Sequence, residues 1–203
     1  MKIAVLLTGI SLGDRAKDWK LAKSQIKDKV INCWPSTFDI SVYITTYPHS
    51  ELKELINFYS PKKHQILDYE TSDQRITYAK SLEMLIGEDI DLIVSTRFDI
   101  DFVYPLSEYP INFNKFNFLF KEGGGWWESH QFTSDNLFIF PKKYLLSLIQ
   151  SVYSLHSNPV RPQTDLHPTY SRLIPLIGKE NTNFLSKKME LSNNNTQYTL
   201  LRS

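Results

Sequence analysis

The stretch Asp91-Leu92-Ile93-Val94-Ser95-Thr96-Arg97-Phe98-Asp99-Ile100-Asp101-Phe102 decides the fold class. Its apolar run, residues 92–94, is typical of a buried strand, and the run ends in polar residues, Arg97 and two aspartates. In an open α/β sheet, ligands bind in the crevice outside the carboxyl ends of the strands. Two carboxylates and a guanidinium at that position suit a divalent cation and the phosphates that it carries. The stretch therefore predicts a ligand site at the end of a central strand.

Strand-like and helix-like segments alternate before this stretch. Residues 3–7 form a continuous apolar run, which is typical of a strand buried on both faces of a parallel sheet. The next segments are a helix from Asp14 that is stopped by Pro35, a strand over 38–44, a short helix over 50–56, a strand over 64–67, and a helix capped by Ser72 or Asp73 and closed by Gly87. This order predicts a parallel, Rossmann-like sheet with right-handed crossovers and flanking helices.

The pattern changes after Pro105. Residues 116–120 and 137–140 are strand-like and are separated by a glycine-rich turn, which predicts a mixed or antiparallel sheet in this half. Pro141 is expected to open a helix, residues 167–177 a helix interrupted by Pro175, and the polar segment from Ser192 is expected to fray. We expect one domain in three parts: a nucleotide-binding half (1–102), a mixed-sheet acceptor half (103–191) and a polar tail (192–203).

The composition narrows the class of protein. Of the 203 residues, 41% are apolar and 22% charged, as in soluble globular domains, and the net charge is +1. A balanced charge argues against a nucleic-acid partner, which requires a basic surface. The single Cys33 excludes an internal disulfide and favours a reducing, cytoplasmic location. We expect neither a signal peptide nor a transmembrane segment, because the apolar start ends at Thr8 and no apolar run approaches bilayer length.

The chain resembles glycosyltransferase domains of the GT-A type. The Asp99-x-Asp101 pair after a buried strand is similar to the DxD motif of that family. The segments Leu6-Leu7-Thr8-Gly9 and Ser134-Asp135-Asn136-Leu137-Phe138-Ile139-Phe140-Pro141 are similar to small bacterial and large-virus members. The resemblance extends to about residue 155, and the DxD is its one named motif.

The resemblance implies a nucleotide-sugar donor whose diphosphate is held by a divalent cation, Mn²⁺ or Mg²⁺, and a glycan, glycoprotein or glycolipid acceptor. Asp99 and Asp101 are the implied cation ligands, with one of them facing the donor, and His167 is the most suitable additional ligand. Aspartates at i and i+2 share a side if the segment is extended. Other residues expected to bind the nucleotide sugar are Thr8, Gly9, Arg15, Thr45, Thr46, Tyr47, Arg75, Arg97, Trp126 and Trp127.

Several of these expected roles have alternatives. Tyr47 is a candidate stacking partner for the base, and Arg97 either meets the diphosphate or pairs with one of the aspartates. Trp126 and Trp127, beside three glycines, either stack on a sugar or anchor their own loop. An inverting transferase also needs a carboxylate base for the acceptor hydroxyl. Asp135 is the first candidate for that base, followed by Glu128 and Glu122.

Three other functions compete with glycosyl transfer. Residues 99–103 also fit the D-x-D-x-[TV] motif of haloacid-dehalogenase-type phosphatases, but that motif normally follows the first strand, and here it lies near residue 100. A nucleotidyltransferase usually carries a glycine-rich basic loop after its first strand, and the Gly9–Gly13 loop with Arg15 imitates it poorly. A non-catalytic module that binds nucleotide or carbohydrate is the third. Neither a GxGxxG nor a P-loop motif is present.

Overall fold

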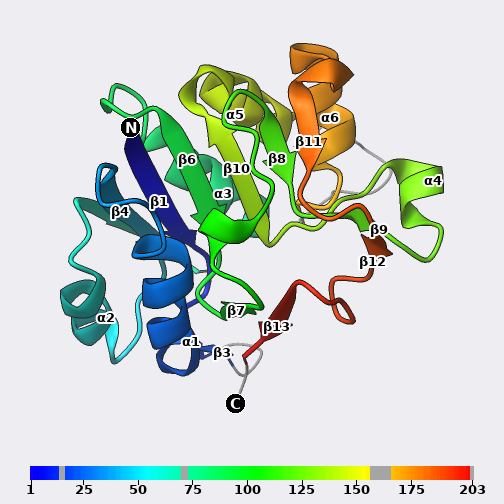
Figure 1. Cartoon of the computed structure of the whole chain (residues 1–203). Helices are drawn as coiled ribbons and strands as arrows, with labels where there is room; N and C mark the ends of the chain where they lie inside the picture. Colours follow the sequence, from blue (N-terminus) through cyan, green and yellow to red (C-terminus); the bar gives the residue numbers. More distant parts are fainter. Residues whose placement is uncertain (14–16, 70–72, 156–165, 202–203) are drawn as a thin grey trace.

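A seven-stranded mixed sheet forms the centre of the computed structural model, which describes residues 1–13, 17–69, 73–155 and 166–201. The strand order is β11-β8-β10-β6-β1-β4-β5 (Figure 1). The strands are β1 (Lys2–Thr8), β4 (Asp39–Thr46), β5 (Lys63–Ile66), β6 (Leu92–Thr96), β8 (Phe116–Phe118), β10 (Leu137–Pro141) and β11 (Thr182–Phe184). Strands β6, β1, β4 and β5 are parallel, whereas β10 runs antiparallel to β6 and β8. The predicted mostly parallel first half and mixed second half are confirmed.

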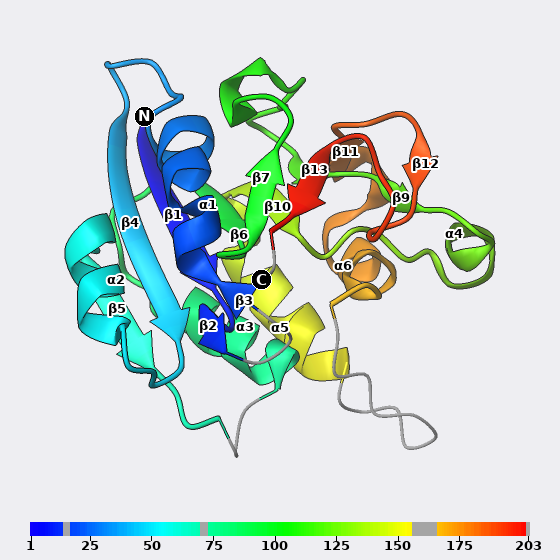
Figure 2. The ribbon, with the colours of Figure 1, turned by 90° about the horizontal axis from the view of Figure 1, so that it is seen from below.

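Helices cover both faces of this sheet. They are α1 (Trp19–Ile26), which continues into a π-helical turn η2 (Lys27–Ile31), α2 (Leu52–Tyr59), α3 (Gln74–Glu83), α5 (Leu145–Ser154) and α6 (Thr169–Ile177). A short helix α4 (Trp126–His130) lies at the margin of the molecule, beyond β9 (Lys121–Glu122) and β12 (Met189–Glu190), in both ribbon views (Figures 1 and 2). In the described part of the chain, the 3₁₀ turns η3 (Leu106–Glu108), η4 (Lys142–Tyr144) and η6 (Lys179–Asn181) connect these elements.

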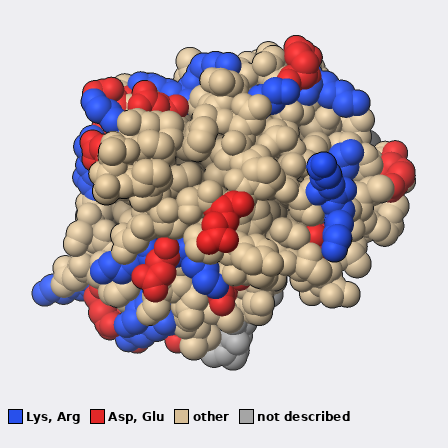
Figure 3. All heavy atoms as spheres, in the orientation of Figure 1, with Lys and Arg blue, Asp and Glu red and all other residues tan. Residues whose placement is uncertain are grey.

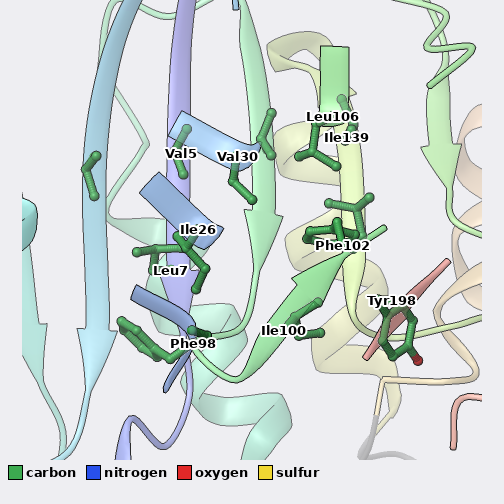
Figure 4. Close-up of a cluster of buried hydrophobic side chains, with 14 of the residues drawn as sticks. Val5, Leu7, Ile26, Val30, Phe98, Ile100, Phe102, Leu106, Ile139 and Tyr198 are labelled. Atoms are coloured by element: carbon green, nitrogen blue, oxygen red, sulfur yellow. The ribbon is translucent and has the colours of Figure 1, made fainter. Parts of the chain in front are cut away.

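The alternation along β1 divides the core into two layers. Ile3, Val5 and Leu7 pack with α1 and α2 on one face. Ala4 and Leu6 pack with α3, α5 and α6 on the other face. Burial on both faces is why this strand reads as a continuous apolar run rather than an alternating one. Figure 4 shows the first layer, in which Phe98, Ile100 and Phe102 lie in one cluster with Ile26 of α1 and Val30 of η2.

The structure differs from the predicted elements at four places, and the first is the start of helix α1. It begins at Trp19 rather than at Asp14, because the Asp18 carboxylate caps it by accepting from the backbone N–H of Lys20 at 2.9 Å. The residues before it form a hairpin of β2 (Leu12–Gly13) and β3 (Lys17–Asp18).

Two prolines also behave differently from the prediction. Pro141 ends β10 and precedes a 3₁₀ turn, so α5 begins at Leu145 instead. Pro175 lies inside α6 without interrupting it. A proline near the end of a nine-residue helix removes one backbone hydrogen bond, and packing of the helix on the sheet offsets that loss.

The fourth difference is the C-terminal segment, which was expected to fray. It forms β13 (Tyr198–Leu200), which pairs antiparallel with β7 (Ile100–Phe102). The Tyr198 side chain is 3% exposed and stacks on Phe120 with ring centroids 6.2 Å apart. The tail therefore completes the first core layer beside the Asp99–Asp101 stretch.

The surface carries both signs of charge. On the face shown in Figure 3, basic and acidic side chains are mixed near the margins and the middle is mostly uncharged. Within the described residues, every helix is too short or too polar to cross a bilayer.

Candidate functional site

Four strand ends meet at one edge of the sheet. The strand register places Thr8 beside Thr45 and Leu7 beside Thr96 at the carboxyl ends of β1, β4 and β6. Because β10 is antiparallel, its first residue Leu137 also pairs with Thr96, so the preceding Asp135 and Asn136 lie at the same edge. This is the position at which open α/β sheets bind ligands.

Most of the predicted nucleoside-binding side chains at this edge are buried. Thr8 Oγ1 is 2.8 Å from Ser81 Oγ, and Thr46 Oγ1 is 2.8 Å from Ser11 Oγ. Thr45 is fully buried. Gly9, which follows Thr8, is partly exposed, and its φ of +105° suits a glycine. Thr8 thus connects the end of β1 to α3, and Thr46 connects the end of β4 to Ser11, whereas the Thr45 hydroxyl is buried without a hydrogen-bond partner among the described residues.

Tyr47 is clamped rather than open for stacking. Its hydroxyl hydrogen-bonds Thr77, its ring meets the edge of Tyr69 at 5.0 Å, and it is 7% exposed. Burial raises the pKa of Tyr47, so the hydroxyl stays protonated. The neighbouring Tyr69 is 50% exposed and presents an open ring at this edge, a feature that the sequence did not single out.

The amino end of α3 also reaches the site. Asp73 caps the helix by accepting from the backbone N–H of Ile76 at 2.7 Å. Gln74 Nε2 donates to Asp135 Oδ2 at 2.7 Å. Arg75 is 3% exposed, with its Nη2 3.3 Å from Asp73 Oδ2, so this predicted nucleotide-binding side chain is enclosed in the structure. Arg15, another predicted binder, lies outside the described residues.

Arg97 pairs with Asp99. Its Nε and Nη2 donate to the two carboxylate oxygens of Asp99 at 2.9 and 2.6 Å, and its Nη1 donates to Asn136 Oδ1 at 2.9 Å. Such a two-pronged contact is the strongest geometry available to an arginine and a carboxylate. Of the two roles considered for Arg97, the structure has the ion pair with an aspartate.

Asp101 has a different partner. Lys29 Nζ, from the π-helical turn η2, lies 2.7 Å from Asp101 Oδ1. The two aspartates do not form one extended segment, because Phe98 and Asp99 lie in a turn and β7 begins at Ile100. Aspartates at i and i+2 share a side only in an extended segment, so Asp99 and Asp101 do not meet this condition.

This arrangement does not fit the predicted cation at the Asp99–Asp101 pair. Asp99 is 1% exposed and both of its oxygens accept from Arg97, whereas Asp101 is paired with Lys29. Across the described residues, no three His, Cys, Asp or Glu side chains form a group suited to a metal ion.

Asp135 lies in the most polar part of the site, together with His167 and Glu122. His167 Nδ1 lies 3.0 Å from the Thr133 carbonyl oxygen, to which it donates, and 3.5 Å from Glu122 Oε1. Its Nε2 lies 3.9 Å from Asp135 Oδ2. His167, predicted as an additional metal ligand, is thus placed between two carboxylates, one of which is the predicted base.

Asp135 is ionised at neutral pH. Burial raises its pKa, but His167, Arg97 and the hydrogen bond from Gln74 more than offset this, so the pKa lies below its usual range. The affinity of this carboxylate for protons is low. It can therefore take the proton of a substrate hydroxyl only as the hydroxyl oxygen forms its new bond.

The C-terminal segment contributes residues that the sequence did not indicate. Tyr198 Oη donates to the Ser192 carbonyl oxygen at 2.8 Å and accepts from Asn136. Ser192 in turn donates to Glu122 through its backbone N–H and its hydroxyl. Burial raises the pKa of Tyr198 to about 12, so its hydroxyl remains a donor. The tail thereby links Arg97 to Glu122 through a continuous polar network.

The remaining predicted residues lie on a hairpin, residues 121–133, that carries α4 at its tip. Glu128 is exposed on α4. The side-chain hydrogen bonds that Asp135 and Arg97 make within the described residues go to Gln74, Asp99 and Asn136. Trp127 is half-buried and packs on Tyr170 at 5.0 Å and on Phe184 at 5.5 Å. Trp126 is 48% exposed. Trp127 therefore attaches the hairpin to the domain, whereas Trp126 lies at the surface.

A groove lies on the other side of α3 from Asp135 in the sheet order, toward the β5 edge. It lies between β5 and α3 and is lined by Lys63, His64, Gln65, Leu67, Lys80, Glu83 and Met84. Its lysines are paired with acids, Lys63 with Glu88 and Lys80 with Glu83.

Comparison with known proteins gives the fold. No family model and no curated protein matches the sequence. Among solved structures, a nucleoside-diphosphate-sugar pyrophosphorylase from Vibrio cholerae matches over 94% of this chain and 92% of its own, with a TM-score of 0.51 and 15% identity. A CTP:phosphocholine cytidylyltransferase from Streptococcus pneumoniae matches over 98% of this chain and 92% of its own, with a TM-score of 0.52 and 11% identity. The chain therefore has the Rossmann-like α/β fold of these two nucleotidyltransferases.

Proposed function

We propose that the protein is a glycosyltransferase that moves a sugar from a nucleoside-diphosphate sugar to an acceptor hydroxyl. The observation that carries the proposal is the buried, ionised Asp135, held by Gln74 at the sheet edge where β1, β4 and β6 end. A fixed carboxylate at that edge is the group that the acceptor's proton requires. The fold similarity to proteins that act on nucleotide-linked substrates supports a nucleotide at the same edge.

In this proposal each group has one role. Asp135 takes the proton of the acceptor hydroxyl as that oxygen bonds to the sugar carbon, and the bond from that carbon to the diphosphate breaks. Arg97, fixed by Asp99 and Asn136, helps to keep the pKa of Asp135 low. His167, held by Thr133, is the larger of the charges that keep the pKa of Asp135 low, and Gln74 orients the carboxylate by its hydrogen bond. A general base of this kind contributes about 10²–10⁴-fold in rate.

The test is a product assay with a panel of UDP-, GDP- and dTDP-sugars and nitrophenyl glycoside acceptors, in which released nucleoside diphosphate is measured. The wild type is expected to form glycosylated product. Asp135→Asn is expected to lose at least about 100-fold in rate while its affinity for nucleoside diphosphate, measured by calorimetry, changes less than about twofold. The matched control is Glu108→Gln, an exposed carboxylate on η3, which should retain its rate. Full activity of Asp135→Asn would remove Asp135 from the mechanism. Runs with Mn²⁺, with Mg²⁺ and with EDTA test the cation separately.

Nucleotidyl transfer is the second candidate, favoured by the match of both solved structures over 92% of their own chains. In that reaction a nucleoside triphosphate and a phosphorylated substrate yield pyrophosphate. The same preparation incubated with nucleoside triphosphates and sugar 1-phosphates or phosphocholine distinguishes the two, because pyrophosphate replaces nucleoside diphosphate as the product. Binding of nucleotide without either product would indicate the non-catalytic module.

The phosphatase is the weakest alternative. It requires an accessible aspartate as nucleophile. Asp99, the first aspartate of the motif, is 1% exposed and bound through both oxygens by Arg97.

A further inference from the structure

The base of the hairpin of residues 121–133 lies in the candidate site. Glu122 N donates to Phe132 O at 3.0 Å, and Ser134 N donates to Phe120 O at 3.1 Å. Glu122 and Thr133, at the base of the hairpin, are the residues that contact His167. The tip carries α4, which projects at the margin of the molecule (Figures 1 and 2). The hairpin thus connects the polar site with an exposed surface.

A row of aromatic rings follows this connection. Trp126 at the tip stacks on Phe132 with ring planes 2° apart and centroids 5.7 Å apart. Phe132 stacks on His167, with planes 21° apart and centroids 6.3 Å apart. The His167 Nε2 lies 3.9 Å from Asp135 Oδ2. The row therefore leads from an exposed indole to the proposed base.

The two tryptophans of the tip are not equivalent. Trp127 packs on Tyr170 and Phe184 and lies 4.5 Å below the Lys121 ammonium, so it attaches the tip to the domain. Trp126 is held by Phe132 on its ring face and is nevertheless 48% exposed. An exposed tryptophan whose orientation is fixed by stacking costs little conformational entropy when it binds a ligand.

The surroundings of Trp126 favour a carbohydrate. The polar residues that follow it in the tip, Glu128, Ser129, His130 and Gln131, are all exposed, and His130 lies against the indole with ring centroids 5.7 Å apart. A sugar ring offers the matching pair of surfaces, with C–H groups on its face for the indole and hydroxyls at its rim for the polar side chains. A purely apolar partner would leave these polar groups unpaired.

We propose that Trp126, stacked on Phe132, forms a binding platform for an oligosaccharide acceptor, whose reactive end reaches Asp135. The inference rests on the proposed glycosyl transfer and names its acceptor class. Two ring-to-ring steps separate Trp126 from His167, so a single sugar ring is too small to cover the path from Asp135 to Trp126. The acceptor therefore contains more than one sugar.

The test uses the full chain and an array of monosaccharides and of oligosaccharides of two to six sugars. Wild type is expected to bind at least one oligosaccharide more tightly than its component monosaccharides. Trp126→Ala should weaken that binding about tenfold, and Trp126→Phe, which keeps an aromatic ring, should weaken it less than about threefold. The control Met189→Ala removes another exposed apolar side chain (53% exposed), on the neighbouring β12, and should bind as wild type does. Nucleoside-diphosphate affinity should be the same in all four proteins.

The outcomes separate this inference from the proposed function. Binding of no oligosaccharide, or equal binding by Trp126→Ala, overturns the platform even if sugar transfer is observed. Oligosaccharide binding that depends on Trp126, without release of nucleoside diphosphate from any donor, supports the platform and overturns the transferase. Equal loss of binding in Met189→Ala also overturns the platform, because it would indicate a nonspecific apolar contact.

Discussion

Arg97 is the residue that joins the parts of the site, because it binds Asp99 and Asn136 at once. Asp99 is 1% exposed, and both of its carboxylate oxygens accept from this guanidinium. Removing one member of a buried ion pair leaves the other charge uncompensated, which is far more costly than losing an exposed pair. A motif that resembles a cation site thus serves in this arrangement as an internal ion pair.

We predict that Arg97→Ala lowers the free energy of unfolding by about 3 kcal/mol, measured by urea denaturation. Arg97→Lys should recover only part of this loss, since an ammonium cannot make the two-pronged contact. Lys29→Ala breaks the half-exposed pair with Asp101 and should cost about 1 kcal/mol or less. Equal costs for Arg97→Ala and Lys29→Ala would show that Asp99 does not depend on the ion pair.

At the scale of elements, the hairpin of residues 121–133 has a fixed base and an anchored tip. Gly124 and Gly125 have φ values of +66° and +85°, which allow the chain to turn into α4. Trp127 then attaches α4 to Tyr170 of α6 and Phe184 of β11. The tip is thus held by one tryptophan and leaves the other for a ligand.

Trp127→Ala should therefore lower the free energy of unfolding by about 2–3 kcal/mol, since a half-buried tryptophan contributes somewhat less than a fully buried one. Trp126→Ala should change it by less than about 0.5 kcal/mol, as expected for an exposed side chain. Both values follow from chemical denaturation with fluorescence and circular dichroism recorded together. If the two variants lose the same stability, the tip is not anchored in this way.

At the scale of the whole molecule, the C-terminal segment closes the fold over the site. It pairs with β7, buries Tyr198 against Phe102 and Phe120, and connects Asn136 to Glu122 through hydrogen bonds. The segment is therefore part of the domain rather than an appendage to it.

Deleting residues 193–203 should lower the free energy of unfolding by about 3–5 kcal/mol, the range for losing a large buried aromatic side chain. Tyr198→Phe keeps the ring and loses only the hydroxyl, so it should cost about 1 kcal/mol. Thermal and urea unfolding of the three proteins measure both effects. A truncated chain as stable as the full one would mean that the tail does not contribute to the core.

The sequence predicted the parallel half well because each strand there carries its own local signal. The run at residues 3–7 is buried on both faces, and Asp73 caps α3 as expected. The position of the site on the sheet was predicted from the sequence, but the residues with which its side chains pair were not. Lys29 and Asp101 are 72 residues apart, and Gln74 and Asp135 are 61 residues apart, so only tertiary packing determines that they meet. The role of the tail was missed because a three-residue strand, β13, is too short to show a hydrophobic period.

The central claim is that a nucleoside diphosphate binds at the carboxyl edge of β1, β4 and β6. Crystals soaked separately with UDP, GDP and dTDP test it most directly. The account predicts density for one of these nucleotides between Gly9 and the amino end of α3, on the side of the sheet edge where Asp135 lies. Density only in the groove lined by Lys63, His64 and Lys80, or no bound nucleotide at millimolar concentration, would contradict it.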